Sequence, residues 1–296
     1  MDQAGLKRPI SNQRWLWWGL GSFFTLVIAF KMGASSVGFS KEGSGEKVGI
    51  VYITGPIISA ETIVKQLEKY RKRTDVSAIV VRIDSPGGLV APTQEIYEKV
   101  KRVREDKPVV SSMGTVAASG GYYIAVAGDT IMANKGTIVG SIGVIMNYPV
   151  MTELLDKVGI EFETVKSGKL KDVGSYSREV TPADRTHLND MVMDMYDQFV
   201  AAVSDGRSMQ KDDIIPLADG RVYTGLQSKT LGLIDLIGTF DDAIDIAGVM
   251  GHISGKPKTI HPQKKRPSLL DWLSGNLGQT VSSWFDELPA YRWRME

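Results

Sequence analysis

The chain contains no cysteine in its 296 residues. This absence excludes disulfide bonds, thiolate nucleophiles and cysteine-ligated metals together. Histidine is almost as scarce: only His187, His252 and His261 occur, and they do not follow a metal-ligand spacing. A zinc site or a histidine-based catalytic triad would have to use these three residues. We therefore expect no metal and no cofactor.

Net charge is also almost absent, because 35 basic residues face 34 acidic ones. Such a balance gives no overall attraction to nucleic acid, so we expect no nucleic-acid partner. Hydrophobic residues make up 43% of the chain, an ordinary share for a globular protein. A chain of this length can bury one good-sized core and still carry an appendage at each end.

Residues 15–30 carry no charge and begin with a cluster of tryptophans. As a helix they would span roughly 24 Å at about 1.5 Å per residue, slightly less than a bilayer core of about 30 Å. Extension to residue 34 closes much of this gap. We therefore predict a transmembrane anchor over residues 15–34, followed by a small, polar and glycine-rich linker over residues 35–46.

Basic residues precede this apolar segment, namely Lys7, Arg8 and Arg14. The positive-inside rule places residues 1–14 in the cytoplasm and everything after the single anchor on the other side of the membrane. A cleaved secretory signal has the same order of charged and apolar residues. Lys31 and the poor cleavage pattern near Ala29 favour the uncleaved anchor.

From residue 47 to 250 the chain alternates β-branched runs with helical patterns, which is typical of an α/β domain with a repeating β-β-α order. The predicted strands are residues 47–53, 78–84, 108–113 and 130–133, and the predicted helices are residues 61–73, 91–104 and 183–205.

A candidate nucleophile, Ser119, follows two alanines and precedes two glycines where a strand should turn into a helix. Small neighbours let a substrate carbonyl approach the hydroxyl, and a helix start offers unpaired N–H groups to an oxyanion. A serine that only caps the helix would have the same neighbours. The turn at residues 85–88, Ser-Pro-Gly-Gly, follows another strand and could aim a second N–H donor, or could be an ordinary tight turn.

A serine hydroxyl needs a base, and no histidine lies near either motif in the sequence. Lys169 and Lys171, in a polar segment rich in glycine and serine, are the candidates. A lysine can act as a base if burial lowers the pKa of its amine, and a hydroxyl such as that of Ser141 could be its partner. A solvated surface lysine is the competing interpretation.

Together these segments resemble the signal peptide peptidases of the protease IV type, a family of membrane-anchored Ser–Lys peptidases. The matching stretches, in family order, are GIVYITGPI (49–57), IDSPGG (83–88), KPVVSSMGTVAASGGYYIA (107–125), GTIVGSIGV (136–144), VKSGKLKDVGSYSRE (165–179) and ADGRVYTGLQSKTLGLID (218–235).

The resemblance implies a Clp-protease/crotonase-like β-β-α superhelix and assigns a role to each motif. Ser119 matches the nucleophile, Lys171 rather than Lys169 the general base, and Ser141 the residue that orients the base. The backbone N–H of Gly120 is implied as one oxyanion donor. The other is implied in the Ser-Pro-Gly-Gly turn, from either Gly87 or Gly88.

The resemblance also implies a function and a location. The chain is expected to be a serine endopeptidase that hydrolyses apolar peptides, notably remnant signal peptides left after secretion. It would be a single-pass protein of the inner (plasma) membrane of a bacterium, with its catalytic domain on the periplasmic side. Because long relatives carry two tandem domains and this chain has one copy of each motif, a ring-shaped homo-oligomer is expected.

Residues 251–296 differ in composition and form a basic, amphipathic tail. Within it, residues 268–289 place apolar side chains near helical spacing. Such a face could contact membrane lipid, a neighbouring subunit or its own domain.

Three rival functions remain for the domain. An acyl-CoA enzyme of the crotonase class would share the fold, but would be expected to use glutamates and normally lacks an anchor. A non-enzymatic binder would not need Ser119 and Lys171. A Ser–His–Asp peptidase is disfavoured by the positions of the histidines.

Overall fold

The structure is a computed structural model that describes residues 46–262 and the backbone of residues 290–292. The predicted anchor at residues 15–34, nearly all of the predicted linker and the amphipathic stretch at residues 268–289 lie outside these described residues. Within the described part of the chain, no helix has both the length and the apolar character needed to cross a membrane.

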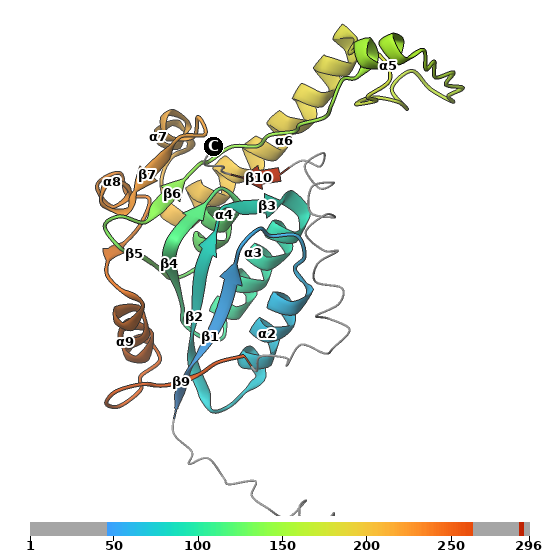
Figure 1. Cartoon of the computed structure of the whole chain (residues 1–296). Coiled ribbons are helices and arrows are strands. Elements are labelled where there is room, and N and C mark those ends of the chain that lie inside the picture. The colour runs from blue at the N-terminus through green and yellow to red at the C-terminus, as the bar shows by residue number, and fades with distance from the viewer. Residues whose placement is uncertain (1–45, 263–289, 293–296) are drawn as a thin grey trace, which may run out of the picture. The chain divides into compact units, whose positions relative to one another are not determined.

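Strands and helices alternate along most of the described chain (Figure 1). The strands are β1 (Lys47–Thr54), β2 (Val76–Ser85), β3 (Gly87–Leu89), β4 (Val109–Ala118), β5 (Thr130–Ala133), β6 (Ile138–Gly140), β7 (Val222–Thr224), β8 (Leu236–Ile237), β9 (Lys258–Ile260) and β10 (Ala290–Arg292). The helices are α2 (Glu61–Lys72), α3 (Val90–Arg104), α4 (Gly120–Ala125), α5 (Thr152–Val158), α6 (Pro182–Arg207), α7 (Lys211–Ile214), the 3-10 turn η1 (Ile215–Leu217), α8 (Gly225–Thr230) and α9 (Phe240–Met250).

A mixed sheet in the order β7-β6-β4-β2-β1-β9 forms the centre of the domain, and β5 and β8 extend it from β4. Every pairing in this sheet is parallel except that of β6 with β7. A parallel sheet needs a crossover between successive strands, and α2 and α3 supply the crossovers from β1 to β2 and from β2 to β4. The predicted α/β architecture is confirmed.

The central strands are apolar on both faces because helices cover both sides of the sheet. Val51, Ile53, Val81 and other residues of one face belong to the larger core, together with residues of α2, α3, α4 and α6. Residues of the other face, among them Ile50, pack against α9 in a smaller core. This burial explains why the strands appear in the sequence as continuous runs of valine and isoleucine rather than as alternating patterns.

The predicted strands and helices appear near their predicted positions, with one extension that matters for the site. The strand expected at residues 108–113 continues as β4 to Ala118, so that it ends immediately before Ser119. The helix predicted at residues 183–205 is α6, and a Thr181 capping box fixes its start.

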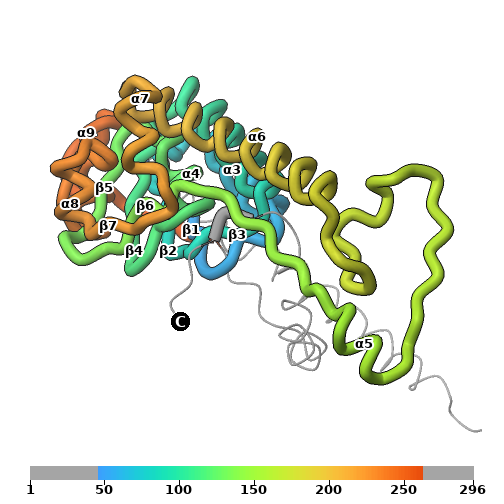
Figure 2. The backbone as a smooth tube through the Cα atoms, turned by 90° about the horizontal axis from the view of Figure 1, so that it is seen from above, coloured from blue at the N-terminus to red at the C-terminus, as the bar shows by residue number. Residues whose placement is uncertain are grey.

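An extended segment precedes α6. We call residues 145–181 the arm; it contains α5 and a long stretch of turns. Figures 1 and 2 both show α5 and the turns that follow it beyond the N-terminal end of α6, away from α4 and from the sheet. The arm therefore connects β6 to α6 without packing into the core of its own domain.

Candidate active site

Three functional motifs meet where neighbouring parallel strands end. In the pairing of β4 with β6, Ala118 lies beside Gly140, so the next residues along, Ser119 and Ser141, leave adjacent strands at the same level. In the pairing of β2 with β4, Ser85 lies beside Ala117, which brings the Ser-Pro-Gly-Gly turn to the same edge. The carboxyl ends of parallel strands are where α/β folds place their sites.

Ser119 has a strained backbone and a buried hydroxyl. Its φ of 53° and ψ of −119° lie outside the regions that L-residues normally occupy. The backbone N–H donates to the carbonyl of Gly140 at 2.7 Å, which ties the serine to the end of β6. The side chain is fully buried, and its Oγ has no hydrogen-bond partner among the described residues. The Ser119 hydroxyl is therefore free to bond to a substrate or to a side chain that is not among the described residues.

Gly120 lies directly against the Ser-Pro-Gly-Gly turn. A Cβ built on Gly120 would lie 3.3 Å from both the Cα of Gly87 and the N of Gly88, and 2.8 Å from the Oγ1 of buried Thr93. Only glycine fits this contact. The backbone N–H of Gly120, which has no helical partner at the start of α4, thus lies near the turn expected to carry the second donor.

Hydrogen bonds distinguish the two glycines of the turn. The N–H of Gly87 donates to the Oγ of Ser85 at 3.1 Å. The N–H of Leu89 donates to the carbonyl of Ile57, and the N–H of Ile57 to the carbonyl of Gly87, both at 2.8 Å. Because N–H groups alternate in direction along a strand, that of Gly88 faces the opposite edge of β3. This arrangement favours Gly88 over Gly87 as the second donor.

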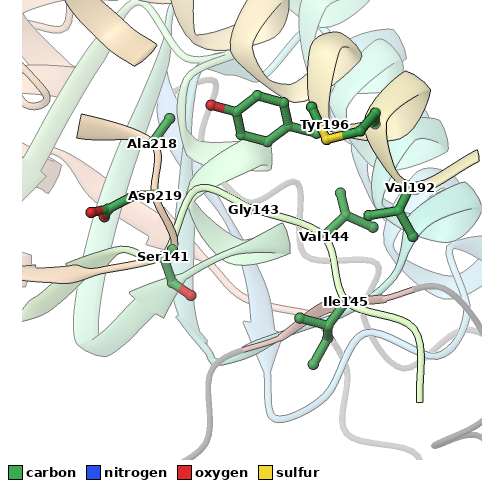
Figure 3. Close-up of a pocket in the computed structure, with 10 residues that line it drawn as sticks. Ser141, Gly143, Val144, Ile145, Val192, Tyr196, Ala218 and Asp219 are labelled. Carbon is green, nitrogen blue, oxygen red and sulfur yellow. The ribbon is translucent and has the colours of Figure 1, made fainter. Parts of the chain in front are cut away.

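Ser141 lies beside a cavity of about 360 Å³ (Figure 3). It has a φ of 49°, follows Gly140 at a φ of 91°, and donates its backbone N–H to the carbonyl of Arg221 at 2.8 Å. Val144, Ile145 and Val192 give this cavity an apolar wall, and Tyr196 and Asp219 add polar groups. Burial raises the pKa of the Tyr196 hydroxyl.

Lys171 and Lys169 do not join this cluster within the described chain. Both lie in the arm and are exposed. Figures 1 and 2 place the turns of the arm beyond the N-terminal end of α6, whereas Ser119 caps α4 beside the sheet. The structure therefore brings together Ser119, Gly120, Ser141 and the glycine turn, but not the lysine.

A charge network fixes the part of the arm that carries Lys171. Arg178 donates to the carboxylates of Asp172 and Asp184, and Lys166 donates to Asp172 at 2.7 Å. These cations, Arg178 first, hold the pKa of Asp172 well below its usual range. Asp184 also accepts the backbone N–H of Thr181 at 3.0 Å, within the cap of α6. Sequence reasoning missed this network, although the mixture of basic and acidic residues from 166 to 184 is a signal that could have indicated it.

Comparison with known proteins supplies the family. The model of peptidase family S49 matches residues 101–250, just over half of the chain, and a Clp protease model matches residues 46–137. The chain belongs to peptidase family S49. A Clp-protease-like α/β fold with a mixed sheet is thereby confirmed, as is the resemblance to signal peptide peptidases of the protease IV type.

Three relatives of this S49 chain illustrate the match. A putative protease of Synechocystis is 43% identical over 69% of this chain and 74% of its own length. A putative signal peptide peptidase of Enterococcus faecium is 37% identical over 62% of this chain and 54% of its own length. Protease 4 of Haemophilus influenzae is 32% identical over 68% of this chain but only 34% of its own length. The chain is therefore a peptidase of this family.

No cation site accompanies the S49 motifs in the described residues, where no group of three or more metal-ligating side chains gathers. The histidines are also separate from the motifs. His187 lies in α6, His252 follows α9 and His261 follows β9, where its ring accepts or donates a hydrogen bond with the hydroxyl of Tyr52 at 3.0 Å. Since Ser119 Oγ has no partner in this part of the chain, no described histidine is bonded to it.

Proposed function

We propose that this S49 peptidase is a serine endopeptidase in which Ser119 is the nucleophile and Lys171 the general base. The observation that carries the proposal is the buried hydroxyl of Ser119, which has no hydrogen-bond partner in the described part of the chain and sits on a strained backbone. An unsatisfied buried hydroxyl costs about 1–3 kcal/mol, and a residue in a sparsely populated φ/ψ region costs about the same again. Two such costs at one residue are typical of a reacting group rather than of a helix cap.

The proposed reaction follows acyl-transfer chemistry. The neutral amine of Lys171 accepts the Ser119 proton while Oγ attacks a peptide carbonyl, and the carbonyl oxygen becomes an oxyanion. The N–H groups of Gly120 and Gly88 hold this oxyanion. The leaving amine takes the proton from Lys171, and an acyl-enzyme remains. Water then attacks the acyl group and gives its proton to Lys171, the bond between the acyl carbon and Ser119 Oγ breaks, and Oγ takes this proton back from Lys171.

The base is proposed to come from a neighbouring subunit. In its own chain Lys171 is exposed on the arm, away from α4. The arm also exposes many large apolar side chains, more than an isolated domain normally leaves in water. A ring-shaped homo-oligomer would bury them and bring the arm of one subunit to the strand ends of the next. These side chains are Ile145, Val150, Met151, Leu154, Val158, Ile160, Phe162, Val165, Leu170 and Tyr176.

An extended peptide is the proposed form of the bound substrate. The strand β10 pairs antiparallel with β3, with Tyr291 beside Gly88, and it contacts α4. The edge of β3 that β10 occupies can thus accept a strand next to the proposed oxyanion donors, and many peptides bind by such strand addition. The apolar wall of the cavity beside Ser141 suits an apolar substrate side chain.

The proposed substrates are apolar peptides, in particular remnant signal peptides. The family, the printed name of the Enterococcus relative and the predicted anchor at residues 15–34 support this class. The corresponding location is the inner membrane of a bacterium, with residues 1–14 in the cytoplasm, the catalytic domain on the periplasmic side, and lipid as a further contact.

Labelling with a serine-directed phosphonate tests the nucleophile. The full chain is treated with the probe, and the modified residue is mapped by mass spectrometry. We expect the label on Ser119, no label on Ser119→Ala, and normal labelling of Ser111→Ala, which removes a fully buried serine hydroxyl from β4, the strand that precedes Ser119. Cleavage of an apolar peptide by Ser119→Ala at the wild-type rate, or a label elsewhere, would overturn the proposal.

A further inference from the structure

The hydroxyl of Ser85 is fully buried and bonded on two sides. Its Oγ donates to the carbonyl of Gly55 at 2.7 Å and accepts the N–H of Gly87 at 3.1 Å. The carbonyl of Gly87 is farther away, at 3.5 Å. Since a hydroxyl has one proton, the shorter bond to Gly55 takes it, and the lone pairs remain for Gly87.

Ser85 thereby links three segments that border the site. Gly55, at a φ of 70°, forms the turn after β1, and Gly87, at a φ of 103°, begins β3. The backbone of Ser85 also contacts the start of α4, because a Cβ built on Gly121 would lie 2.8 Å from the Ser85 carbonyl oxygen. A displacement of Ser85 would therefore move both the glycine turn and the start of α4, the helix that begins after Ser119.

The bond from Gly87 has a consequence for its neighbour. The peptide that carries the Gly88 N–H also carries the Gly87 carbonyl, which accepts the N–H of Ile57. The Ser85 hydroxyl joins Gly87 to Gly55, two residues before Ile57, and so holds this segment against the turn. The N–H of Gly88 must then face the edge of β3 along which β10 runs, beside Gly120. Loss of the Ser85 hydroxyl would release the segment at residues 55–57 from the glycine turn, and the peptide that Ile57 holds, with its Gly88 N–H, would no longer be kept in one direction.

We propose that Ser85 is a positioning residue whose hydroxyl joins the Gly55 carbonyl to the Gly87 N–H, keeps Ile57 bonded to the Gly87 carbonyl, and so holds the Gly88 N–H aimed at the oxyanion. This inference rests on the proposed function, since an oxyanion forms only if Ser119 attacks a carbonyl. It assigns to the serine of the Ser-Pro-Gly-Gly turn a role distinct from that of its glycines.

A purely structural role makes a different prediction. Loss of two buried hydrogen bonds would lower stability whatever the site does, as would Ser111→Ala, which removes a bond from a fully buried Oγ to the carbonyl of Ala125 at 2.9 Å. If Ser85 aims the Gly88 N–H, its loss should raise the energy of the transition state, in which negative charge develops on the substrate oxygen, and not that of the bound substrate. It should therefore lower kcat and leave KM nearly unchanged.

The test uses the full chain and four variants: Ser85→Ala, Ser85→Cys, Ser85→Thr and, as the matched control, Ser111→Ala. Peptide hydrolysis gives kcat and KM. Inhibition is measured with a peptide aldehyde and with the peptide alcohol of the same sequence. Addition of Ser119 Oγ to the aldehyde forms one C–O bond, opens the C=O bond to an oxyanion and passes the serine proton to the base, whereas the alcohol binds without this step.

We expect Ser85→Ala to lower kcat by about tenfold to a hundredfold, less than the hundredfold to thousandfold loss of an oxyanion donor itself. Its affinity for the aldehyde should fall by a similar factor, and its affinity for the alcohol should stay within about twofold. Ser85→Cys, which fills the site with a weakly bonding thiol, should show the same loss if Ser85→Ala does not fold. Ser85→Thr should recover most of the aldehyde affinity, and Ser111→Ala should match the wild type in all three measurements.

Equal loss of aldehyde and alcohol affinity, or a Ser85→Ala enzyme whose kcat stays within twofold of Ser111→Ala, would overturn the positioning role. A Ser119→Ala variant, assayed alongside, separates the two ideas. If Ser119→Ala is inactive while Ser85→Ala behaves like the control, only the inference about Ser85 fails. If Ser119→Ala remains active, the proposed function fails with it.

Discussion

Arg178 forms a bidentate ion pair with the carboxylate of Asp172, with its Nε 2.9 Å from Oδ2 and its Nη2 2.9 Å from Oδ1. Asp172 follows Lys171 directly, so this pair fixes the backbone next to the proposed base. Arg178 also donates to the buried carboxylate of Asp184 in α6. Arg178 therefore links the turn that carries Lys171 to the start of α6, although this turn lies on the exposed arm.

Asp172→Asn should weaken this turn and lower peptidase activity by about tenfold, because a neutral amide cannot replace the charge-assisted bonds to Arg178 and Lys166. Trypsin digestion of the intact protein should cut faster after Lys169 or Lys171 in this variant. Asp156→Asn is the control, since Asp156 lies in α5 and its carboxylate has no hydrogen bond within residues 46–262. Unchanged activity and unchanged trypsin cleavage in Asp172→Asn would show that the pair does not position the base.

Gly88→Ala should destabilise the domain by about 1–3 kcal/mol and abolish peptide hydrolysis. Its Cβ would lie 2.1 Å from the carbonyl oxygen of Ile57 and 2.5 Å from the Ile57 nitrogen, so the backbone of the turn must move. Urea unfolding and a peptide assay measure the two effects. Gly136→Ala is the matched control, because nothing lies within 4 Å of its Cβ. An active Gly88→Ala enzyme would contradict the close approach of the turn to the site.

Much of the cluster could be predicted from the sequence because its parts are local. Ser119 follows a buried strand, the Ser-Pro-Gly-Gly turn follows another, and parallel strands end at a common edge. Local pattern is therefore sufficient to propose Ser119 and the glycine turn as parts of one site, whereas Ser141 is only a possible hydroxyl partner of the lysine until the resemblance assigns its role. Lys171 was different: its role came from the resemblance alone, and the structure leaves it on an exposed arm.

The remaining features depend on contacts that no local pattern encodes. The choice between Gly87 and Gly88 follows from a hydrogen bond to Ser85 Oγ, which depends on the path of the turn in three dimensions. The pairing of β10 with β3 joins residues about 200 positions apart, and three residues are too few to give a strand pattern. The strained φ of Ser119 occurs where its N–H bonds to the carbonyl of Gly140 in the neighbouring β6, a contact between residues about 20 positions apart.

The Arg207–Asp235 ion pair should make stability depend on pH. Burial opposes the charge on Asp235, but Arg207 and the N–H of Ile131 outweigh it and lower the pKa of that carboxyl. A depressed folded pKa means that the stabilisation is complete above the ordinary carboxyl pKa, about 4, and is lost as pH falls through the folded value.

Asp235→Asn removes this charge and should cost about 1–3 kcal/mol at pH 7, less than a fully buried pair because the carboxylate is 35% exposed. Urea unfolding at several pH values should show the difference from wild type constant above about pH 4 and shrinking at lower pH. Asp245→Asn, on the exposed side of α9, should match wild type throughout. A difference that persists undiminished at pH 2 would contradict an ionic origin.

Mixed assemblies can test whether Ser119 and Lys171 of different subunits form one site. Ser119→Ala and Lys171→Ala should each be inactive alone, because each lacks one reacting group at every site. If a site takes its serine from one subunit and its lysine from the next, random co-assembly leaves about a quarter of the sites complete, since each partner is the required variant about half of the time. Co-expression of the two variants should then restore about a quarter of wild-type activity.

Ser119→Ala mixed with the double variant should stay inactive, since no subunit supplies a serine. Complete inactivity of the first mixture, with co-assembly shown by affinity tags, would mean that both residues act within one chain, and that the arm must fold back onto its own α4.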